Sequence, residues 1–302
     1  MSADSCTLFG VPSRKLWFLL SAPLATGLLG VLVLRHHGGA APRLALMLGA
    51  MIAGVLVATT LAVKGRALLE RFAPVLAVGA LALLAATLFG EGLLGVRRWI
   101  GLGPIRLHAS SIACPILLAA AAMLLSRAGG FWALVAIVAA QVIHVLQPDG
   151  GQSTALAAGA MTGIASWPAP LRIRAASMGV IAVSIVPAWM RPDPLPSVLE
   201  VEGIVRLAGD MGRPVQALAI LLLALLPASL AVAARGVQMA PADAPERRRE
   251  AVACAALAAY VAGTILAPML GNFPVPVLGF GVSPVLGIGI CVGFSVALGE
   301  QA

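Results

Sequence analysis

Charged residues are scarce in this sequence. Only 11% of its 302 residues are Asp, Glu, Lys or Arg, and lysine occurs only as Lys15 and Lys64. Soluble globular proteins carry about 25% charged residues, so this composition excludes a soluble globular protein. Apolar residues make up 60% of the chain, and its mean hydropathy is +1.00. These values predict an all-α, polytopic integral membrane protein with a single membrane domain over residues 1–302.

The sequence also lacks the usual signatures of metal, disulfide and soluble-enzyme sites. The cysteines at positions 6, 114, 254 and 291 lie far apart, with no CxxC pair and no histidine at ligand spacing, so we expect neither a metal site nor a disulfide. There is no P-loop, no GxSxG and no HExxH motif. Gly287 and Gly289 fall within an apolar run and indicate helix packing. The net charge of +8 is typical of the positive-inside rule, and we expect no nucleic-acid partner.

Apolar runs predict about ten transmembrane helices, with both termini cytoplasmic. The predicted spans are 16–34, 44–63, 72–89, 109–126, 131–147, 153–170, 175–190, 214–234, 251–270 and 277–298. We expect a cytoplasmic linker at 235–250 and a short outer loop at 191–213. Most basic residues on the outer side lie in 91–108 and 191–213, where the positive-inside rule disfavours them. An anionic ligand would explain them, and a solvated loop is the alternative.

The first candidate functional segment runs from Gly95 to Pro104 (GVRRWIGLGP). Arg97 and Arg98 offer planar groups of donors that suit phosphate oxygens, and Trp99 is of the type that prefers the bilayer interface. The segment therefore predicts a site for the headgroup of an anionic lipid. The alternative is an interfacial anchor that touches ordinary phospholipid.

The second candidate segment is 147–152 (QPDGGQ), between the fifth and sixth predicted spans. Asp149 lies at membrane depth or just outside it, where an unpaired carboxylate is costly. We therefore expect a buried ion pair between Asp149 and Arg97 or Arg98.

A polar stripe precedes this segment. Gln141, His144 and Gln147 recur every three residues, so they share one face of the fifth span and point into the bundle. Interhelical hydrogen bonding is the favoured interpretation, and a proton relay through His144 is the alternative.

The third candidate segment is 271–284 (GNFPVPVLGFGVSP), which leads into the tenth span. Proline and glycine at this density prevent a regular helix. Irregular backbone at membrane depth is tolerated only where protein or a wet cavity covers it. The segment therefore predicts the wall of a cavity, with a plain re-entrant turn as the alternative.

In order and spacing, these segments resemble the SEDS family of bacterial cell-wall proteins, the RodA/FtsW-like proteins. That family has ten spans, an outer loop close to G-x-R-R-W-I-x-x-G followed by Q-P-S-E-x-x-K, a P-D-x-G-T/S segment after span five, and P-F-x-S-Y-G-G-S-S at span ten. The matching residues are Gly95, Arg97, Arg98, Trp99, Ile100, Gly103, Pro148, Asp149, Gly151, Pro276, Gly281 and Ser283. The resemblance covers essentially the whole chain.

The sequence departs from the family pattern in three places. Where the family has Q-P-S-E-x-x-K, this chain has HASS at 108–111 and then Cys114, so the family's acid and base are missing. Phe280 stands in place of the family's tyrosine. The loop 191–213 is shorter than the family's and lacks the stretch that carries its catalytic aspartate. Asp210, just ahead of span eight, is the positional candidate for that role, and an ordinary solvated acid is the alternative.

The resemblance implies a multi-pass protein of the bacterial inner membrane that acts on an undecaprenyl-pyrophosphate-linked cell-wall precursor, lipid II. It would be a peptidoglycan glycosyltransferase in cell division or cell-shape maintenance, working among membrane lipids with a class B penicillin-binding protein. Asp210 would be its catalytic residue, and a divalent cation (Mg²⁺ or Mn²⁺) would assist the leaving pyrophosphate. The residues implied in substrate binding are Arg97, Arg98, Trp99, His108, Asp149 and Ser283.

Two other functions remain open on the sequence. The missing acid and base favour a catalytically degenerate relative that serves as a membrane scaffold or lipid-binding partner. A lipid flippase or transporter is the second alternative, in which His144 and Asp149 would be ionisable gating groups.

Overall fold

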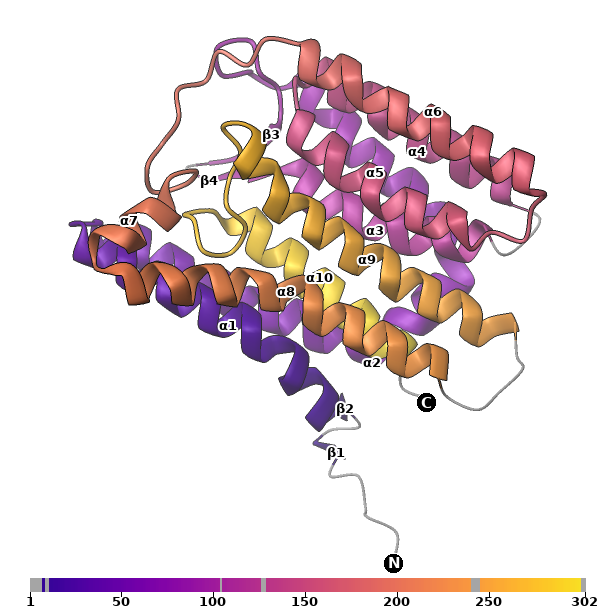
Figure 1. The fold of residues 1–302 in the computed structure, drawn as a ribbon, viewed down its shortest axis with the longest axis horizontal. Helices are drawn as coiled ribbons and strands as arrows, with labels where there is room; N and C mark the ends of the chain where they lie inside the picture. The colour runs from indigo at the N-terminus through magenta and orange to yellow at the C-terminus, as the bar shows by residue number, and fades with distance from the viewer. Residues whose placement is uncertain (1–6, 9–10, 104, 126–128, 240–244, 300–302) are drawn as a thin grey trace, which may run out of the picture.

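The structure, a computed structural model, describes residues 7–8, 11–103, 105–125, 129–239 and 245–299. Over these residues it is an all-α bundle with two small β-hairpins (Figure 1). The helices are α1 (Ser13–His36), α2 (Ala41–Ala86), the 3-10 turn η1 (Thr87–Phe89), α3 (Ala109–Leu125), α4 (Gly130–Leu146), α5 (Gly150–Ala165), α6 (Leu171–Met190), α7 (Ile204–Asp210), α8 (Arg213–Met239), α9 (Pro245–Leu270) and α10 (Val282–Leu298). The antiparallel hairpins are β1 (Thr7–Leu8) with β2 (Val11–Pro12), and β3 (Trp99–Leu102) with β4 (Ile105–His108).

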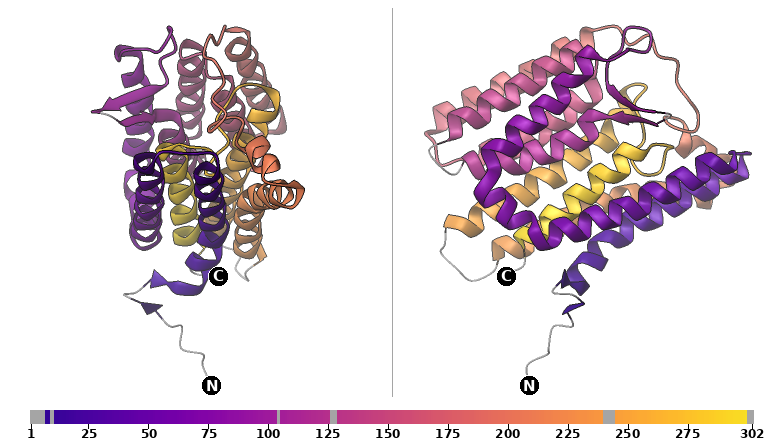
Figure 2. Two further views of the ribbon diagram at one scale, coloured as in Figure 1. Left: turned by 90° about the vertical axis from the view of Figure 1, so that its left-hand side faces the viewer. Right: turned by 180° about the vertical axis from the view of Figure 1, so that it is seen from behind.

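Helix α2 makes a bend where the sequence predicts two spans. It has 46 residues, and only Phe72 inside it has non-helical dihedral angles (φ −124°, ψ 16°). Pro74 follows two residues later; it lacks a backbone N–H and clashes with the preceding turn, which breaks the helix here. Figure 2 shows the two arms that meet at the bend. A straight helix of this length would measure about 69 Å, more than twice the hydrocarbon thickness of about 30 Å. The predicted spans 44–63 and 72–89 fall on the two arms.

The connections between helices gather at two ends of the bundle (Figures 1 and 2). The β3–β4 hairpin, segment 191–203, α7 and segment 271–281 lie at one end, which we call the hairpin end. At the other end, the linker end, α8 finishes at Met239 and α9 begins at Pro245. The expected linker 235–250 is therefore helical at both of its ends, and its middle, 240–244, lies outside the described residues.

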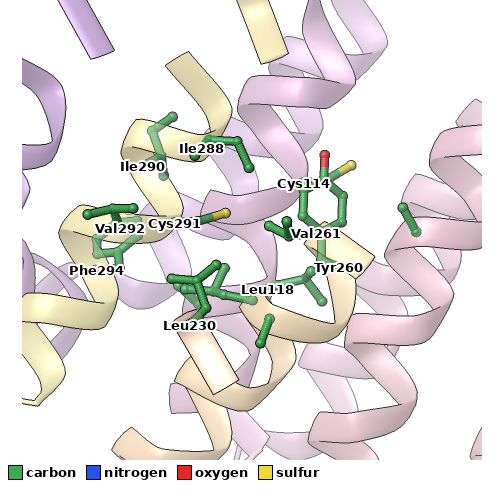
Figure 3. Packing of buried hydrophobic residues seen from close by; sticks show 14 of the residues in the cluster. Cys114, Leu118, Leu230, Tyr260, Val261, Ile288, Ile290, Cys291, Val292 and Phe294 are labelled. Atoms are coloured by element: carbon green, nitrogen blue, oxygen red, sulfur yellow. The ribbon is translucent and has the colours of Figure 1, made fainter. Parts of the chain in front are cut away.

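The core lies between α3, α9 and α10. Figure 3 shows Cys114 and Leu118 of α3, Tyr260 and Val261 of α9, and Cys291 of α10 in this region. Each is at most 3% exposed. Alanine is the most frequent buried residue of the core, and such small side chains allow helices to approach closely.

Glycines allow the closest helix approaches. A Cβ added to Gly287 of α10 would collide with the Ser111 carbonyl of α3, and one added to Gly289 would collide with the Gly54 carbonyl of α2. Backbone, rather than a flexible side chain, occupies both places. The interpretation of these two glycines as packing residues fits this geometry.

Five of the described helices are long and apolar enough to cross a membrane, judged by length and composition. These segments are Arg14–His36, Ala41–Phe89, Leu171–Met190, Arg213–Gln238 and Arg247–Leu270. Helices α3, α4 and α10 are apolar but shorter, with 17 residues each. The helices follow the ten predicted spans closely, but α5 already ends at Ala165, before the Trp167–Pro170 break. The number of membrane crossings stays a prediction.

Candidate functional site

A cavity of about 520 Å³ opens at the hairpin end. The β3–β4 hairpin, the start of α5, segment 195–202, the C-terminal half of α9 and segment 272–284 line it. Its polar and charged side chains include residues of all three candidate segments and of the shortened outer loop, beside others from β4, α3 and α9. The wall expected from residues 271–284 is present.

The hairpin separates the two adjacent arginines. Consecutive side chains of an extended segment point to opposite sides. Arg98 is 4% exposed and lines the cavity. Arg97 is exposed, is absent from the cavity lining, and donates through Nη1 to the Leu88 carbonyl at 2.8 Å. Of the two arginines expected to bind an anion, only Arg98 reaches the cavity.

Arg98 connects the hairpin to two other parts of the chain. Its Nε donates to the Gln147 carbonyl at 3.4 Å, and its Nη2 donates to the Pro148 carbonyl. Nη2 also lies 2.6 Å from Oδ2 of Asp193 in the outer loop. The guanidinium lies over the ring of Phe273, 5.5 Å from its centroid. These contacts hold a buried cation at a fixed position in the wall.

Asp149 pairs with a histidine. Its side chain is 1% exposed, and its Oδ2 accepts a hydrogen bond from His108 Nε2 at 3.0 Å. Its Oδ1 accepts from the Gln152 backbone N–H at 3.2 Å, so Asp149 is the N-cap of α5. The expected direct ion pair of Asp149 with Arg97 or Arg98 is not formed among these described residues, because Arg97 points away and Arg98 is directed to Asp193.

The charge of Arg98 still acts on Asp149. Burial opposes ionisation of this carboxyl group, but the nearby charge of Arg98 and the contact with His108 outweigh burial, so the pKa of Asp149 is lowered from its ordinary value. Asp149 is therefore a buried carboxylate.

His108 joins the first and third candidate segments. Its Nδ1 lies 2.9 Å from Ser111 Oγ, and its backbone N–H donates to Ser283 Oγ at 2.7 Å. Trp99 pairs with His108 across the hairpin, and their rings meet edge to face with centroids 6.0 Å apart. The structure thus brings five of the predicted binding residues to one cavity. They are Arg98, Trp99, His108, Asp149 and Ser283.

Asp210 does not belong to this cavity. It ends α7, its side chain is 62% exposed, and its Oδ2 lies 4.0 Å from His37 Nε2 of the α1–α2 connection. Asp210 was predicted as a site residue because it lies just ahead of α8 in the sequence. In the structure it stands at the end of α7, beside His37 and outside the cavity. The acids of the outer loop that reach the site are Asp193, which binds Arg98, and Glu202, which lines the cavity.

Two loops that face each other hold Glu202. The Phe280 N–H donates to the Glu200 carbonyl at 2.8 Å, and the Val275 N–H donates to the Val201 carbonyl at 3.2 Å. Oε2 of Glu202 accepts from the Val198 N–H at 2.6 Å. Burial raises the pKa of Glu202 despite this hydrogen bond. A carboxylate with a raised pKa is a stronger proton acceptor than an ordinary glutamate.

Sequence reasoning also missed Arg106 and Tyr260. Arg106 lines the cavity and is exposed, and Tyr260 of α9 donates through its OH to Gln152 Oε1 at 2.8 Å. Arg106 and His108 are two residues apart on β4, so strand alternation alone puts them on one face. That signal was available in the sequence, whereas no local pattern distinguishes Tyr260 from a core residue.

The polar stripe of α4 is engaged in hydrogen bonds between helices. Gln141 Nε2 donates to the Ser153 carbonyl at 3.0 Å and Gln147 Nε2 donates to Thr87 Oγ1 at 2.6 Å. His144 is fully buried, with Nδ1 3.5 Å from Gln141 Oε1. This geometry favours the structural interpretation of the stripe over a proton relay.

The residues present do not fit a divalent cation. Within the described residues there is no group of three or more His, Cys, Asp or Glu side chains placed to bind a metal ion. Asp149 and Asp193 each already accept from a basic side chain. The cavity therefore offers a preformed arrangement of guanidinium, imidazole and carboxylate groups rather than a cluster of oxygen ligands.

These features define a class: an all-α, polytopic membrane protein with a polar cavity at one end of the bundle. A family model described as "Cell cycle protein", covering FtsW, RodA and SpoVE, matches residues 35–195, which is more than half of the chain. The chain belongs to this family, and the predicted membership is confirmed.

Solved structures show the same fold. The rod shape determining protein RodA of Thermus thermophilus matches with a TM-score of 0.67 and 21% identity, covering 94% of this chain and 96% of that one. A mutant of that protein matches with a TM-score of 0.72 and 20% identity, covering 94% and 97%. A chain of a peptidoglycan synthase complex that coordinates polymerisation and crosslinking matches with a TM-score of 0.68 and 20% identity, over 94% and 97%. No curated protein matches the sequence. The predicted all-α, polytopic membrane fold is confirmed.

Proposed function

We propose that the cavity at the hairpin end binds a lipid-linked disaccharide pyrophosphate and that the protein transfers its glycan to a growing strand. The supporting observation is that one cavity of about 520 Å³ holds buried Arg98, exposed Arg106 and half-buried Glu202 together. Membership of the family supports the choice of this substrate class. The chemistry of these three side chains suits an anionic leaving group and a hydroxyl acceptor.

The two arginines would bind the pyrophosphate. Arg98 is fixed by the Gln147 and Pro148 carbonyls and by Asp193, so little of its position has to be organised when a ligand arrives. Arg106 adds a second guanidinium from the same hairpin. As the glycosidic carbon–oxygen bond to the pyrophosphate breaks, the electron pair stays on the phosphate oxygen, and these cations stabilise the added charge.

Glu202 would be the general base in place of Asp210. It would accept the proton of the acceptor hydroxyl, whose oxygen then attacks the anomeric carbon. The raised pKa of Glu202 suits this task. Asp149 is paired with His108, whereas Glu202 lines the cavity and forms no salt bridge with a basic side chain among the described residues. His108, Asp149 and Ser283 would position the wall around the substrate.

Purified protein incubated with lipid II, with and without a class B penicillin-binding protein, tests this function. Glu202→Gln should lower glycan formation by about 100-fold or more, the usual contribution of a general base, while Asp210→Asn, an acid of the same loop outside the cavity, should retain it. Because a carboxylate with a raised pKa is protonated as pH falls, activity should decrease toward acid pH in the wild type.

The same assay separates the alternatives. Lipid II binding without polymer under any condition would support the non-catalytic scaffold. Equal activity of Glu202→Gln and the wild type would exclude Glu202 as the base. A flippase is less well supported, because the buried His144 ring already contacts Gln141 Oε1 of its own helix at 3.5 Å and Cys114 Sγ of α3 at 3.8 Å. Translocation of labelled lipid in vesicles measures that activity directly.

The proposal places the protein in the bacterial inner membrane with both termini cytoplasmic and the hairpin end outside. Reporter fusions at Arg66 and Pro245 should then give a cytoplasmic signal, and one at Gly203 an outer signal. A similar fold occurs in a peptidoglycan synthase complex, which supports a transpeptidase partner of the class B type. A cytoplasmic signal at Gly203 would contradict this orientation.

A further inference from the structure

A second and larger cavity, of about 1250 Å³, lies at the linker end. Helices α8 and α9 form its two long walls, and Ala122 and Leu125 of α3, Gly163 of α5 and the turn with Trp167 and Pro168 complete the lining. Figure 1 shows α9 between α5 and α8 in this part of the bundle. The cavity shares α9 with the candidate site but uses another face of that helix, and nothing in the proposed glycan chemistry involves it.

Most of this cavity is a long slot lined by small side chains. On α9, Ala255, Ala259 and Ala262 recur three to four residues apart and face it. The opposite wall repeats this spacing on α8. Its members are Ala224, Ala228 and Ala231, all exposed. From Arg247 to Ala262 the slot follows α9 for about 22 Å, a length comparable to that of an extended fatty acyl chain.

One mouth of the slot is basic. Arg235 of α8 and Arg248 and Arg249 of α9 line the cavity there, together with Gln238 and Arg247. Arg235 and Arg248 are exposed, and no carboxylate is among the described lining residues. The cavity is therefore apolar along its length and cationic at the membrane surface.

The arginines of α9 also sit at an unfavourable end of their helix. Arg247 and Arg248 fall in the first turn of α9, and Arg249 follows directly, at the end where the helix dipole is positive and favours anions. Glu250, the next residue, is buried and binds Arg66 of α2 at 2.8 Å. A bound anion at this mouth would offset both the dipole and the cluster of positive charge.

We propose that this cavity is a binding site for an anionic phospholipid of the leaflet at the linker end. The phosphate of the lipid contacts Arg235, Arg248 and Arg249, and one acyl chain lies in the alanine-lined slot. Trp167, a residue type that prefers the bilayer interface, also lines the cavity. A neutral lipid matches the slot but not the mouth, and a free phosphate matches the mouth but not the slot.

Native mass spectrometry of the delipidated full-length protein in a neutral detergent tests the site. The protein is titrated with phosphatidylglycerol, with phosphatidylcholine of the same acyl chains, and with inorganic phosphate. Phosphatidylglycerol should bind with a defined stoichiometry, and the other two should not. In the triple variant Arg235→Gln, Arg248→Gln, Arg249→Gln, its apparent affinity should fall about 100-fold, since each basic residue near an anionic lipid contributes about fivefold.

Two further variants keep the result specific. Lys64→Gln, Arg71→Gln, Arg172→Gln removes the same charge from exposed residues outside the cavity and should bind like the wild type. Ala255→Trp with Ala259→Trp fills the slot and should abolish binding with every arginine in place. Thermal unfolding without lipid verifies that each variant is folded.

Three outcomes would overturn the proposal. Equal losses in the two triple variants would mean that net charge alone attracts the lipid. Equal binding of phosphatidylcholine would mean that the arginines do not select the headgroup. Undiminished binding in the double tryptophan variant would place the acyl chain elsewhere.

Discussion

The two cavities are both lined by helix α9, but they differ in how their charged side chains are compensated. At the hairpin end, Arg98 binds Asp193 and His108 binds Asp149. At the linker end, the described lining contains arginines and no carboxylate. The first cavity neutralises its buried charges internally and so holds them in place before any ligand binds. The second leaves its charge at the membrane surface, where water or a lipid phosphate can compensate it.

The charges at the hairpin end stabilise the folded protein, whereas those at the linker end are available to bind an anionic ligand. A buried ion that loses its partner is costly, because the survivor remains desolvated. An exposed guanidinium costs little to remove. Substitutions at the two ends should therefore differ sharply in their effect on stability, and the following expectations test that contrast.

The largest effect is expected for Asp149→Ala. The substitution removes the partner of His108 and the N-cap of α5 at once. We expect a loss of about 3–5 kcal/mol in the free energy of unfolding, typical for one member of a buried pair. Asp149→Asn should lose less, because its amide oxygen can still accept from the Gln152 N–H. Thermal or denaturant unfolding in detergent measures both. A loss below about 1 kcal/mol would show that the hairpin end does not depend on paired charge.

A double-mutant cycle tests which partner Asp149 has. Asp149→Ala combined with His108→Ala should show a coupling of about 1–3 kcal/mol, as contacting residues do. Asp149→Ala combined with Arg97→Ala should be additive within about 0.5 kcal/mol, because Arg97 points to the Leu88 carbonyl. The reverse result would restore the ion pair expected from the sequence.

The pH dependence of stability gives a smaller, graded effect. The pKa of Asp149 is lowered in the folded protein, since the charge of Arg98 and the contact with His108 outweigh burial. Above the ordinary aspartate pKa of about 4, its carboxylate therefore contributes fully to stability. As pH falls below that value, the unfolded chain gains a proton that the folded protein resists, and the contribution is lost. The stability difference between wild type and Asp149→Asn should thus shrink below about pH 4. A stability difference between the two proteins that stays constant below about pH 4 would contradict a lowered pKa of Asp149.

The smallest effect is expected for Arg235→Gln at the linker end. Without anionic lipid, it should change the free energy of unfolding by less than about 0.5 kcal/mol, as exposed substitutions usually do. With phosphatidylglycerol present, the wild type should gain more stability than the variant. A large loss without lipid would mean that Arg235 is structural, and the contrast between the two ends would disappear.

Much of the fold could be predicted from the sequence, because membrane insertion requires long apolar helices. The two arms of α2 and helices α3, α4, α6, α8, α9 and α10 lie where apolar runs occur. The weakest predictions were helix ends. Helices α8 and α9 extend into the charged stretch expected as a linker, because arginine and glutamine form helix readily once a helix has begun.

The candidate site was predictable in part. The three segments meet at one cavity, but the pairing inside it depends on directions that spacing does not give. Alternation along an extended segment indicates that Arg97 and Arg98 point apart, but the contacts of Arg98 with the Gln147 and Pro148 carbonyls and with Asp193 decide which one points inward. No pattern in the sequence distinguishes Glu202 from Asp210 as the acid that reaches the site. Backbone hydrogen bonds between two distant loops place Glu202 in the cavity, and no local pattern records such contacts.

The bend of α2 limits how the length of the chain can change. An ordinary surface loop absorbs an inserted residue at little cost, but the two arms of α2 meet at Phe72 with no loop between them. One extra residue there would rotate the second arm by about 100°. Its buried side, which carries Ala73, Ala77, Ala80 and Leu84, would then turn away from the bundle. Insertions and deletions should therefore be far rarer at this bend than in segment 191–203. The exact number of residues in α2 around Phe72 sets which side of the second arm faces the bundle.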